Sequence, residues 1–108
     1  MSHKLDRIES TIAREISRII LEEAHNELIK NVGITNVTVD EDLTFAKVYF
    51  MTRDIEVEKV EEALNNASGF IRKNLAHSLD LRSTPELKFV YDKSMDYTKK
   101  IEDIIDNL

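Results

Sequence analysis

The chain has 108 residues, of which 42% are hydrophobic and 33% charged, with a formal net charge of −6 at pH 7 and no cysteine. This length predicts one domain spanning residues 1–108, and the composition is typical of a folded globular protein. The lack of cysteine excludes disulfides, thiolate catalysis and thiolate zinc sites. No apolar stretch is long enough to cross a membrane, and the N-terminus is charged where a signal peptide would be apolar, so we expect a cytoplasmic protein.

The first predicted element is a long amphipathic helix from Lys4 to about Ile29. Its apolar residues recur three and four positions apart, which is the spacing of one buried helical stripe. Asn31 and Gly33 are expected to end it, since glycine readily adopts the left-handed conformation that terminates helices. The stripe consists of Leu5, Ile8, Ile12, Ile16, Ile19, Ile20, Ala24 and Leu28.

Two strands follow, at residues 34–40 and 43–51, because side-chain character alternates along both stretches. The polar run 40–42 lies between them, which predicts an antiparallel hairpin. A third strand is predicted over residues 87–92 by the same alternation. Since helices precede it, we expect it to pair in parallel with one strand of the hairpin.

Two helices are predicted between the hairpin and the third strand. Asp54 is the expected N-cap of the first, and Ser68 and Gly69 mark a kink from which the second continues. Phe70 lies in the apolar stripe of that second helix, and Pro85 is expected to end it.

After the third strand, Ser94 is expected to cap a last helix running to Leu108. The predicted order is therefore helix, strand, strand, helix, helix, strand, helix. Such an order favours an α+β domain in which the helices cover a three-stranded sheet.

Residues suited to catalysis or cofactor binding are scarce. The three histidines, His3, His25 and His77, are far apart and lack metal-ligand spacing. With only two glycines, the chain forms neither a phosphate-binding loop nor a dinucleotide fingerprint. We therefore expect no metal, no cofactor and no enzymatic activity.

Two groups of basic residues are candidate phosphate-binding sites. Arg7, Arg14 and Arg18 share one face of the first helix, where they either contact phosphate or form ion pairs with neighbouring glutamates. Arg72 and Lys73 follow the kink, with His77 one turn later, and backbone amides at a helix start there would add donors. An ordinary solvated helix, with Gly69 serving close packing, is the alternative for the second group.

Three stretches, DLTFAKVYF at residues 42–50, ASGFIR at 67–72 and LRSTPELKF at 81–89, resemble the bacterial ribosome-binding factor A family. The resemblance covers nearly the whole chain, with the motifs in the family's order and spacing. It implies a type II KH-like domain in which an Ala-x-Gly kink, here Ala67-Ser68-Gly69, replaces the usual GxxG loop.

The resemblance also implies a function. Family members are non-enzymatic assembly factors that bind the immature small ribosomal subunit and aid maturation of its rRNA, including 5′-end processing and adaptation to cold. Carried onto this chain, the RNA-facing surface comprises the kink, Arg72, Lys73, and the neighbouring Arg82 and Lys88. Assembly GTPases and initiation factors on the same particle are implied as functional neighbours.

A second hypothesis is a protein-interaction module that docks through its amphipathic helices without contacting RNA. Salt separates the two hypotheses, because phosphate contacts weaken steeply with salt and an apolar helix interface does not. Monomer is the expected state, since no aromatic-rich patch predicts an interface.

Overall fold

The structure is a computed structural model, and it describes residues 3–23, 25–79 and 83–94. The strand order is β1-β2-β3, with β1 antiparallel to β2 and β3 parallel to β2. This confirms both the predicted hairpin and the predicted parallel pairing. In chain order the elements are α1 (His3–Glu23), α2 (Glu27–Lys30), β1 (Gly33–Val39), β2 (Phe45–Met51), α3 (Val57–Asn66), α4 (Ser68–Ser78) and β3 (Glu86–Tyr91).

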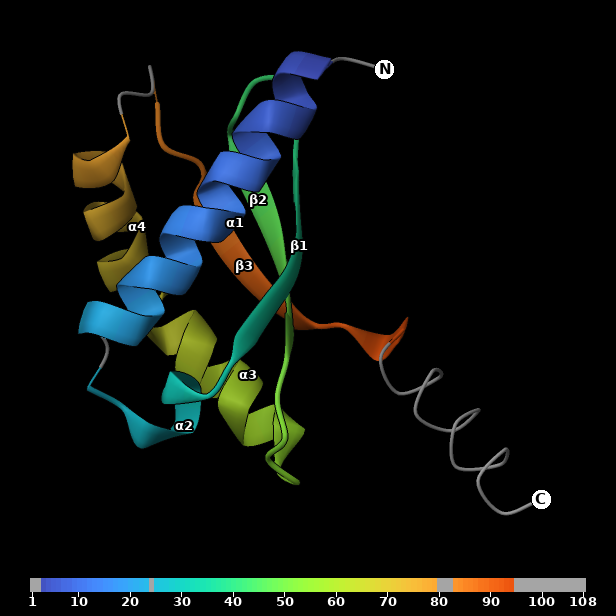
Figure 1. Ribbon diagram of the computed structural model, residues 1–108, viewed down its shortest axis with the longest axis vertical. Helices are drawn as coiled ribbons and strands as arrows, with labels where there is room; N and C mark the ends of the chain where they lie inside the picture. Colours follow the sequence, from blue (N-terminus) through green and yellow to red (C-terminus); the bar gives the residue numbers. More distant parts are fainter. Residues whose placement is uncertain (1–2, 24, 80–82, 95–108) are drawn as a thin grey trace.

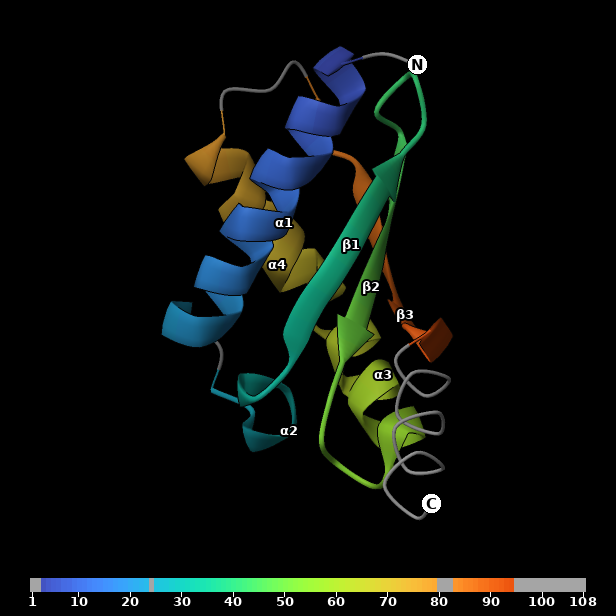
Figure 2. The ribbon, with the colours of Figure 1, turned by 45° about the vertical axis from the view of Figure 1, so that its right-hand side comes forward.

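The long helices α1, α3 and α4 lie on one side of the sheet, which confirms the two-layer α+β architecture (Figures 1 and 2). Alternation along β2 and β3 turns every second side chain toward these helices. Each large side chain buried in the core stabilises the fold by about 1.5–3 kcal/mol. The buried apolar residues are Ile12, Ile16, Ile19, Ile20, Ile29, Val37, Ala46, Val48, Phe50, Val60, Leu64, Ile71, Leu75, Leu87 and Phe89.

The predicted first helix is in fact two helices, so the expectation of one helix reaching Ile29 is wrong. α1 ends at Glu23, and Asn26 starts the short α2 by accepting a hydrogen bond from the Leu28 amide at 2.9 Å. The apolar side of α2 does not continue the apolar stripe of α1. Leu28, predicted to be buried, is 36% exposed, and Ile29 enters the core in its place.

Gly33 does not end a helix, contrary to our expectation. It has no positive φ and is the first residue of β1, whereas Asn31 forms the C-cap of α2. A Cβ at Gly33 would lie 3.2 Å from Cγ of Met51 on the neighbouring strand. The glycine therefore serves the close approach of β2.

The hairpin turn is closed by Asp40. Its Oδ1 accepts hydrogen bonds from the amides of Thr44 at 2.7 Å and Phe45 at 3.2 Å. Leu43 takes a left-handed backbone conformation, with φ of 57°. The carboxylate thus replaces backbone partners that the turn leaves open.

The ends of the α3–α4 pair differ from the sequence prediction. Asp54 accepts a hydrogen bond from the Glu56 amide at 2.9 Å, so it forms a turn before the helix and is not its N-cap, which is Glu56. α4 ends at Ser78, well before Pro85, and Phe70 is 47% exposed instead of buried. The predicted helix beyond Ser94 lies outside the described residues.

Side chains form hydrogen bonds with backbone groups at both edges of the sheet. On β3, the Asn65 amide group donates to the Phe89 carbonyl at 3.0 Å and accepts from the Phe89 N–H at 2.9 Å. Glu61 accepts from the Tyr91 N–H at 2.9 Å, and on β1 Glu9 accepts from the Val39 N–H at 2.8 Å. These contacts tie α3 and α1 to the sheet and block strand addition at those positions.

Asp92 holds the end of β3 to β1. Its carboxylate accepts hydrogen bonds from the Ser94 amide and hydroxyl and from the Thr35 hydroxyl. The Ser94 hydroxyl, followed by Thr35, lowers the pKa of Asp92. Because the folded-state pKa is depressed, this contribution to stability is present above the ordinary aspartate pKa and is lost as the pH falls below it.

Replacing Asn65 by alanine tests its role as a tether between α3 and β3. We expect Asn65→Ala to lower the free energy of unfolding by about 2 kcal/mol, because it leaves two partly buried backbone groups of Phe89 without partners. Urea denaturation measures the change. Asn66→Ala, on the exposed neighbouring position, is the control and should be nearly neutral. Equal effects of the two variants would contradict the assignment.

Candidate nucleic-acid interface

The two middle helices meet at a kink of one residue, which confirms the kink predicted from the sequence. α3 ends at Asn66 and α4 begins at Ser68, with Ala67 between them. The first hydrogen bond of α4 runs from the Ile71 amide to the Ala67 carbonyl at 2.9 Å. The first-turn amides before Ile71 therefore have no acceptor within the helix.

The start of α4 carries no neutralising group of its own. α4 has no side-chain cap and no acidic residue in its first turn. The unpaired amides and the helix dipole favour an anion at such a position. The first turn consists of Ser68, Gly69 and Phe70.

Gly69 is not required by packing. A Cβ there would meet no atom within 4 Å, and the φ of Gly69 is not positive. The alternative that Gly69 permits close helix packing is therefore wrong. The bare backbone instead leaves room for a ligand to approach the amides.

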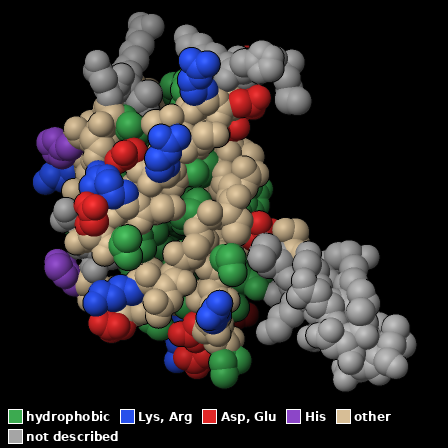
Figure 3. Space-filling model, in the orientation of Figure 1, with side chains coloured by type: hydrophobic (Ala, Val, Ile, Leu, Met, Phe, Trp, Pro, Cys, Tyr) green, Lys and Arg blue, Asp and Glu red, His purple; other side chains and the backbone are tan. Residues whose placement is uncertain are grey.

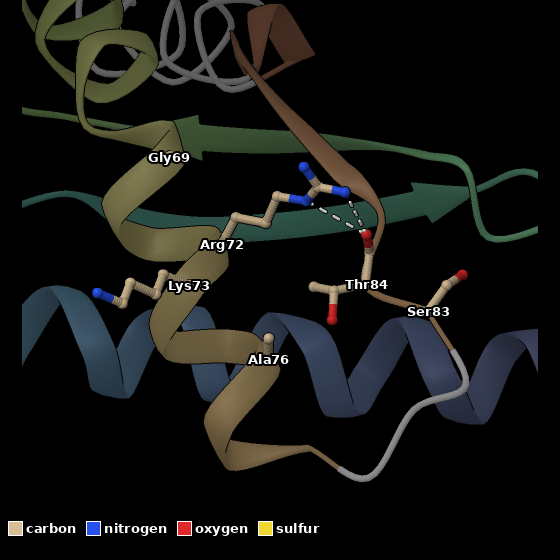
Figure 4. Close-up of a pocket in the computed structure, with 6 residues that line it drawn as sticks. All are labelled: Gly69, Arg72, Lys73, Ala76, Ser83 and Thr84. Atoms are coloured by element: carbon tan, nitrogen blue, oxygen red, sulfur yellow. Dashed lines mark hydrogen bonds between the residues drawn. The ribbon is translucent and has the colours of Figure 1, made fainter.

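A shallow hollow of about 440 Å³ lies beside this helix start. One wall is α4 and the other is the segment before β3 (Figure 4). Arg72 spans the hollow, since its Nε and Nη2 donate to the Thr84 carbonyl at 3.2 and 2.9 Å. The guanidinium remains exposed, so it both fixes the far wall and supplies positive charge. The lining residues are Gly69, Arg72, Lys73, Ala76, Ser83 and Thr84.

Lys73 and His77 add further donors to the α4 side. Lys73 is exposed and points away from Thr84, toward solvent (Figure 4). His77 is exposed one turn later on the same helix. We call this set, with the kink Ala67–Gly69, Arg72 and the Ser83–Thr84 wall, the kink surface.

The arginines of α1 are arranged differently. Arg18 is held by Glu15 and Glu22, both at 2.9 Å, and donates to the Ser78 hydroxyl at 2.8 Å. The hydrogen bonds that Arg18 donates to Glu15 and then to Glu22 raise the pKa of Arg18. The charge of Arg18 is therefore paired within α1, and its guanidinium links α1 to α4.

Arg7 and Arg14 are exposed on α1. Cations and acids alternate over this helix on the face shown in Figure 3. Such a mixed surface attracts phosphate weakly compared with an unopposed cation. We therefore place Arg14 at the margin of the candidate interface.

Of the two predicted residues that follow α4, Lys88 does not join the kink surface. Lys88 alternates with the buried Leu87 and Phe89, so it lies on the opposite face of the sheet from α4. Arg82 lies outside the described residues.

Thr84 and Ser83 were not identified from the sequence as parts of the site. Thr84 contributes its backbone carbonyl to Arg72, and a backbone contribution leaves no side-chain signal. Within the described residues, no group of three or more histidine or acidic side chains is placed to bind a metal ion, and no helix is long and apolar enough to span a membrane.

Comparison with known proteins identifies the family. The model of the family described as "Ribosome-binding factor A" matches residues 4–105. The chain belongs to this family. A relative from Macrococcus caseolyticus named ribosome-binding factor A is 40% identical over 110 residues, covering 100% of this chain and 96% of the relative.

Solved structures of ribosome-binding factor A share the fold. The crystal structure from Thermus thermophilus superposes with a TM-score of 0.74 at 21% identity, covering 81% of this chain and 94% of that one. A homology model of the Thermus thermophilus protein, fitted into a cryo-EM map of a 30S complex, gives a TM-score of 0.63 at 20% identity, covering 87% and 97%. These likenesses support the KH-like fold.

Gly69→Ala tests whether the glycine is there for the fold. We expect this variant to be more stable than the parent by about 0.5 kcal/mol, because alanine is the better helix former and nothing obstructs its methyl group. Thermal unfolding measures the difference. Gly33→Ala is the comparison variant and should gain less stability than Gly69→Ala, since its methyl would lie 3.2 Å from Cγ of Met51. A Gly69→Ala variant less stable than the parent would show that packing requires the glycine.

Proposed function

We propose that this protein is a non-enzymatic assembly factor that binds the immature small ribosomal subunit through the kink surface and aids late maturation of its rRNA, including 5′-end processing and growth in the cold. Family membership supports the general role. The Thermus thermophilus relative fitted into the map of a 30S complex supports the small subunit as the binding partner.

One observation carries the choice of surface: the start of α4 has no side-chain cap and no acidic residue in its first turn. Three amides without helix partners, a glycine with open space above it, and exposed Lys73 lie next to one another. Phosphate fits this combination because it accepts hydrogen bonds from amides and pairs with the ammonium group. We expect recognition to rest on RNA shape and backbone charge, with little readout of base sequence.

The protein-interaction hypothesis has less support. The middle of the apolar stripe of α1 is buried in the core, where Ile12, Ile16 and Ile19 are fully buried. This part of α1 is therefore not free to dock on a partner, whereas the predicted helix beyond Ser94 lies outside the described residues. Assembly GTPases and initiation factors remain proposed neighbours on the same particle.

Lys73→Glu is the direct test of the proposed surface. Arg72 is a less suitable position, because reversing its charge would also release Thr84. We expect Lys73→Glu to weaken binding to immature small subunits about tenfold, as loss of one charge-assisted phosphate contact would do. Co-sedimentation of purified protein with immature and mature subunits measures the affinity.

Lys59→Glu, at an exposed lysine on α3, is the matched control and should bind like the parent. Lys73→Gln should also flatten the salt dependence of binding, with a slope smaller by about 1 in log–log form. Equal binding by Lys73→Glu and the parent would overturn the proposed surface. Retention on neither particle, at low salt, would overturn the function.

A further inference from the structure

The sheet face turned away from the helices is open in the described structure. Side chains on this face alternate with the core residues of β2 and β3, and α1, α3 and α4 all pack on the other side (Figure 2). β2 is the central strand, so its outward residues occupy the middle of this open face. The open face is separate from the kink surface, which lies on the helix side.

Two lysines lie side by side at the centre of the open face. Lys47 on β2 is in register with Lys88 on β3, and both are exposed. Neighbouring strands are about 4.8 Å apart, and like charges placed opposite each other there are destabilising. Ion pairs in the described residues involve other cations, so neither lysine has a carboxylate partner among them. A bound anion would remove this repulsion.

Aromatic rings flank the lysines along β2. Phe45 is 58% exposed, and Tyr49 is half-buried two residues beyond Lys47. All three residues point to the same face because side chains on a strand repeat every second position. The two rings are about 13 Å apart along the strand, with the lysine pair between them.

We propose that the open face binds single-stranded RNA, with phosphate on Lys47 and Lys88 and bases stacked on Phe45 and Tyr49. Exposed rings on a sheet stack unpaired bases, and adjacent cations follow the backbone. A duplex does not fit, because its bases are already stacked. A protein partner fits less well, since the middle of the face is charged.

Acidic groups limit where the RNA backbone can cross the open face. Glu86 is in register with Phe45, and Glu41 and Asp42 lie in the hairpin turn at the same end. These carboxylates repel phosphate from the Phe45 end. The RNA backbone therefore crosses at the lysine row, and the base beside it reaches Phe45.

The proposal extends the proposed function by a second RNA contact and rests on it for the source of the RNA. The probe is a fluorescein-labelled twelve-nucleotide oligouridine, titrated with the full chain and followed by fluorescence anisotropy. Phe45→Leu should weaken binding about tenfold, because stacking on one ring is lost. Phe45→Tyr keeps a ring and should bind like the parent.

The lysine pair gives a second, independent readout. Joint replacement of Lys47 and Lys88 by glutamine should reduce the log–log salt slope by about 1.4, at about 0.7 for each phosphate contact on a single strand. Joint replacement of Lys30 and Lys59 by glutamine changes the net charge equally elsewhere and should leave the slope unchanged. Urea denaturation verifies that each variant is folded.

The proposal is overturned if the parent does not bind the oligonucleotide at low salt. It is also overturned if Phe45→Leu binds the oligonucleotide as tightly as Phe45→Tyr. The same holds if glutamine at Lys47 and Lys88 gives the same log–log salt slope as glutamine at Lys30 and Lys59. The proposed function fails separately, if the protein is retained on neither immature nor mature small subunits at low salt. A Lys73-dependent subunit interaction with no oligonucleotide binding would overturn the open-face proposal alone.

Discussion

The parallel pairing of β3 with β2 is the constraint on which the rest of the structure depends. A parallel connection requires the chain to cross from one end of the sheet to the other, and here α3 and α4 make that crossing. Both helices must also bury an apolar face on the same side of the sheet as α1. The direction change between them falls on Ala67 alone, so the chain has no room for a loop that would cover the start of α4.

Uncovered amides at the kink are thus a consequence of the topology, and the protein holds them in place from several sides. Asn65 anchors the end of α3 to β3, and Arg72 anchors α4 to Thr84, in the segment before the same strand. Arg18 connects the far end of α4 to α1 through Ser78. Arg72 and Arg18 are engaged in these contacts and position the surface, whereas the exposed Lys73 points away from Thr84 (Figure 4) and is the cation that we propose contacts phosphate. A protein of net negative charge can therefore present a local cluster of cations.

Periodicity predicted most of the fold, because the alternation in the strands and the stripes in the helices are direct consequences of one-sided burial. It failed where a single polar side chain changes the backbone path, as at Asn26, whose hydrogen bond starts a new helix. Gly33 was misread because the sequence does not show Met51 beside it. The kink was predictable from composition, whereas the Arg72 contact depends on a backbone carbonyl and on tertiary placement.

The most direct test of the account is to ask which part of the protein lies against rRNA. The chain has no cysteine, so a backbone-cleaving reagent can be tethered to one introduced cysteine at a time. Ala76→Cys places it in the hollow that the kink surface lines, and Ile55→Cys places it beyond the C-terminal end of β2, at a side chain that is 96% exposed. We predict cleavage of small-subunit rRNA from position 76 and little from position 55. Cleavage from position 55 with none from position 76 would contradict the account.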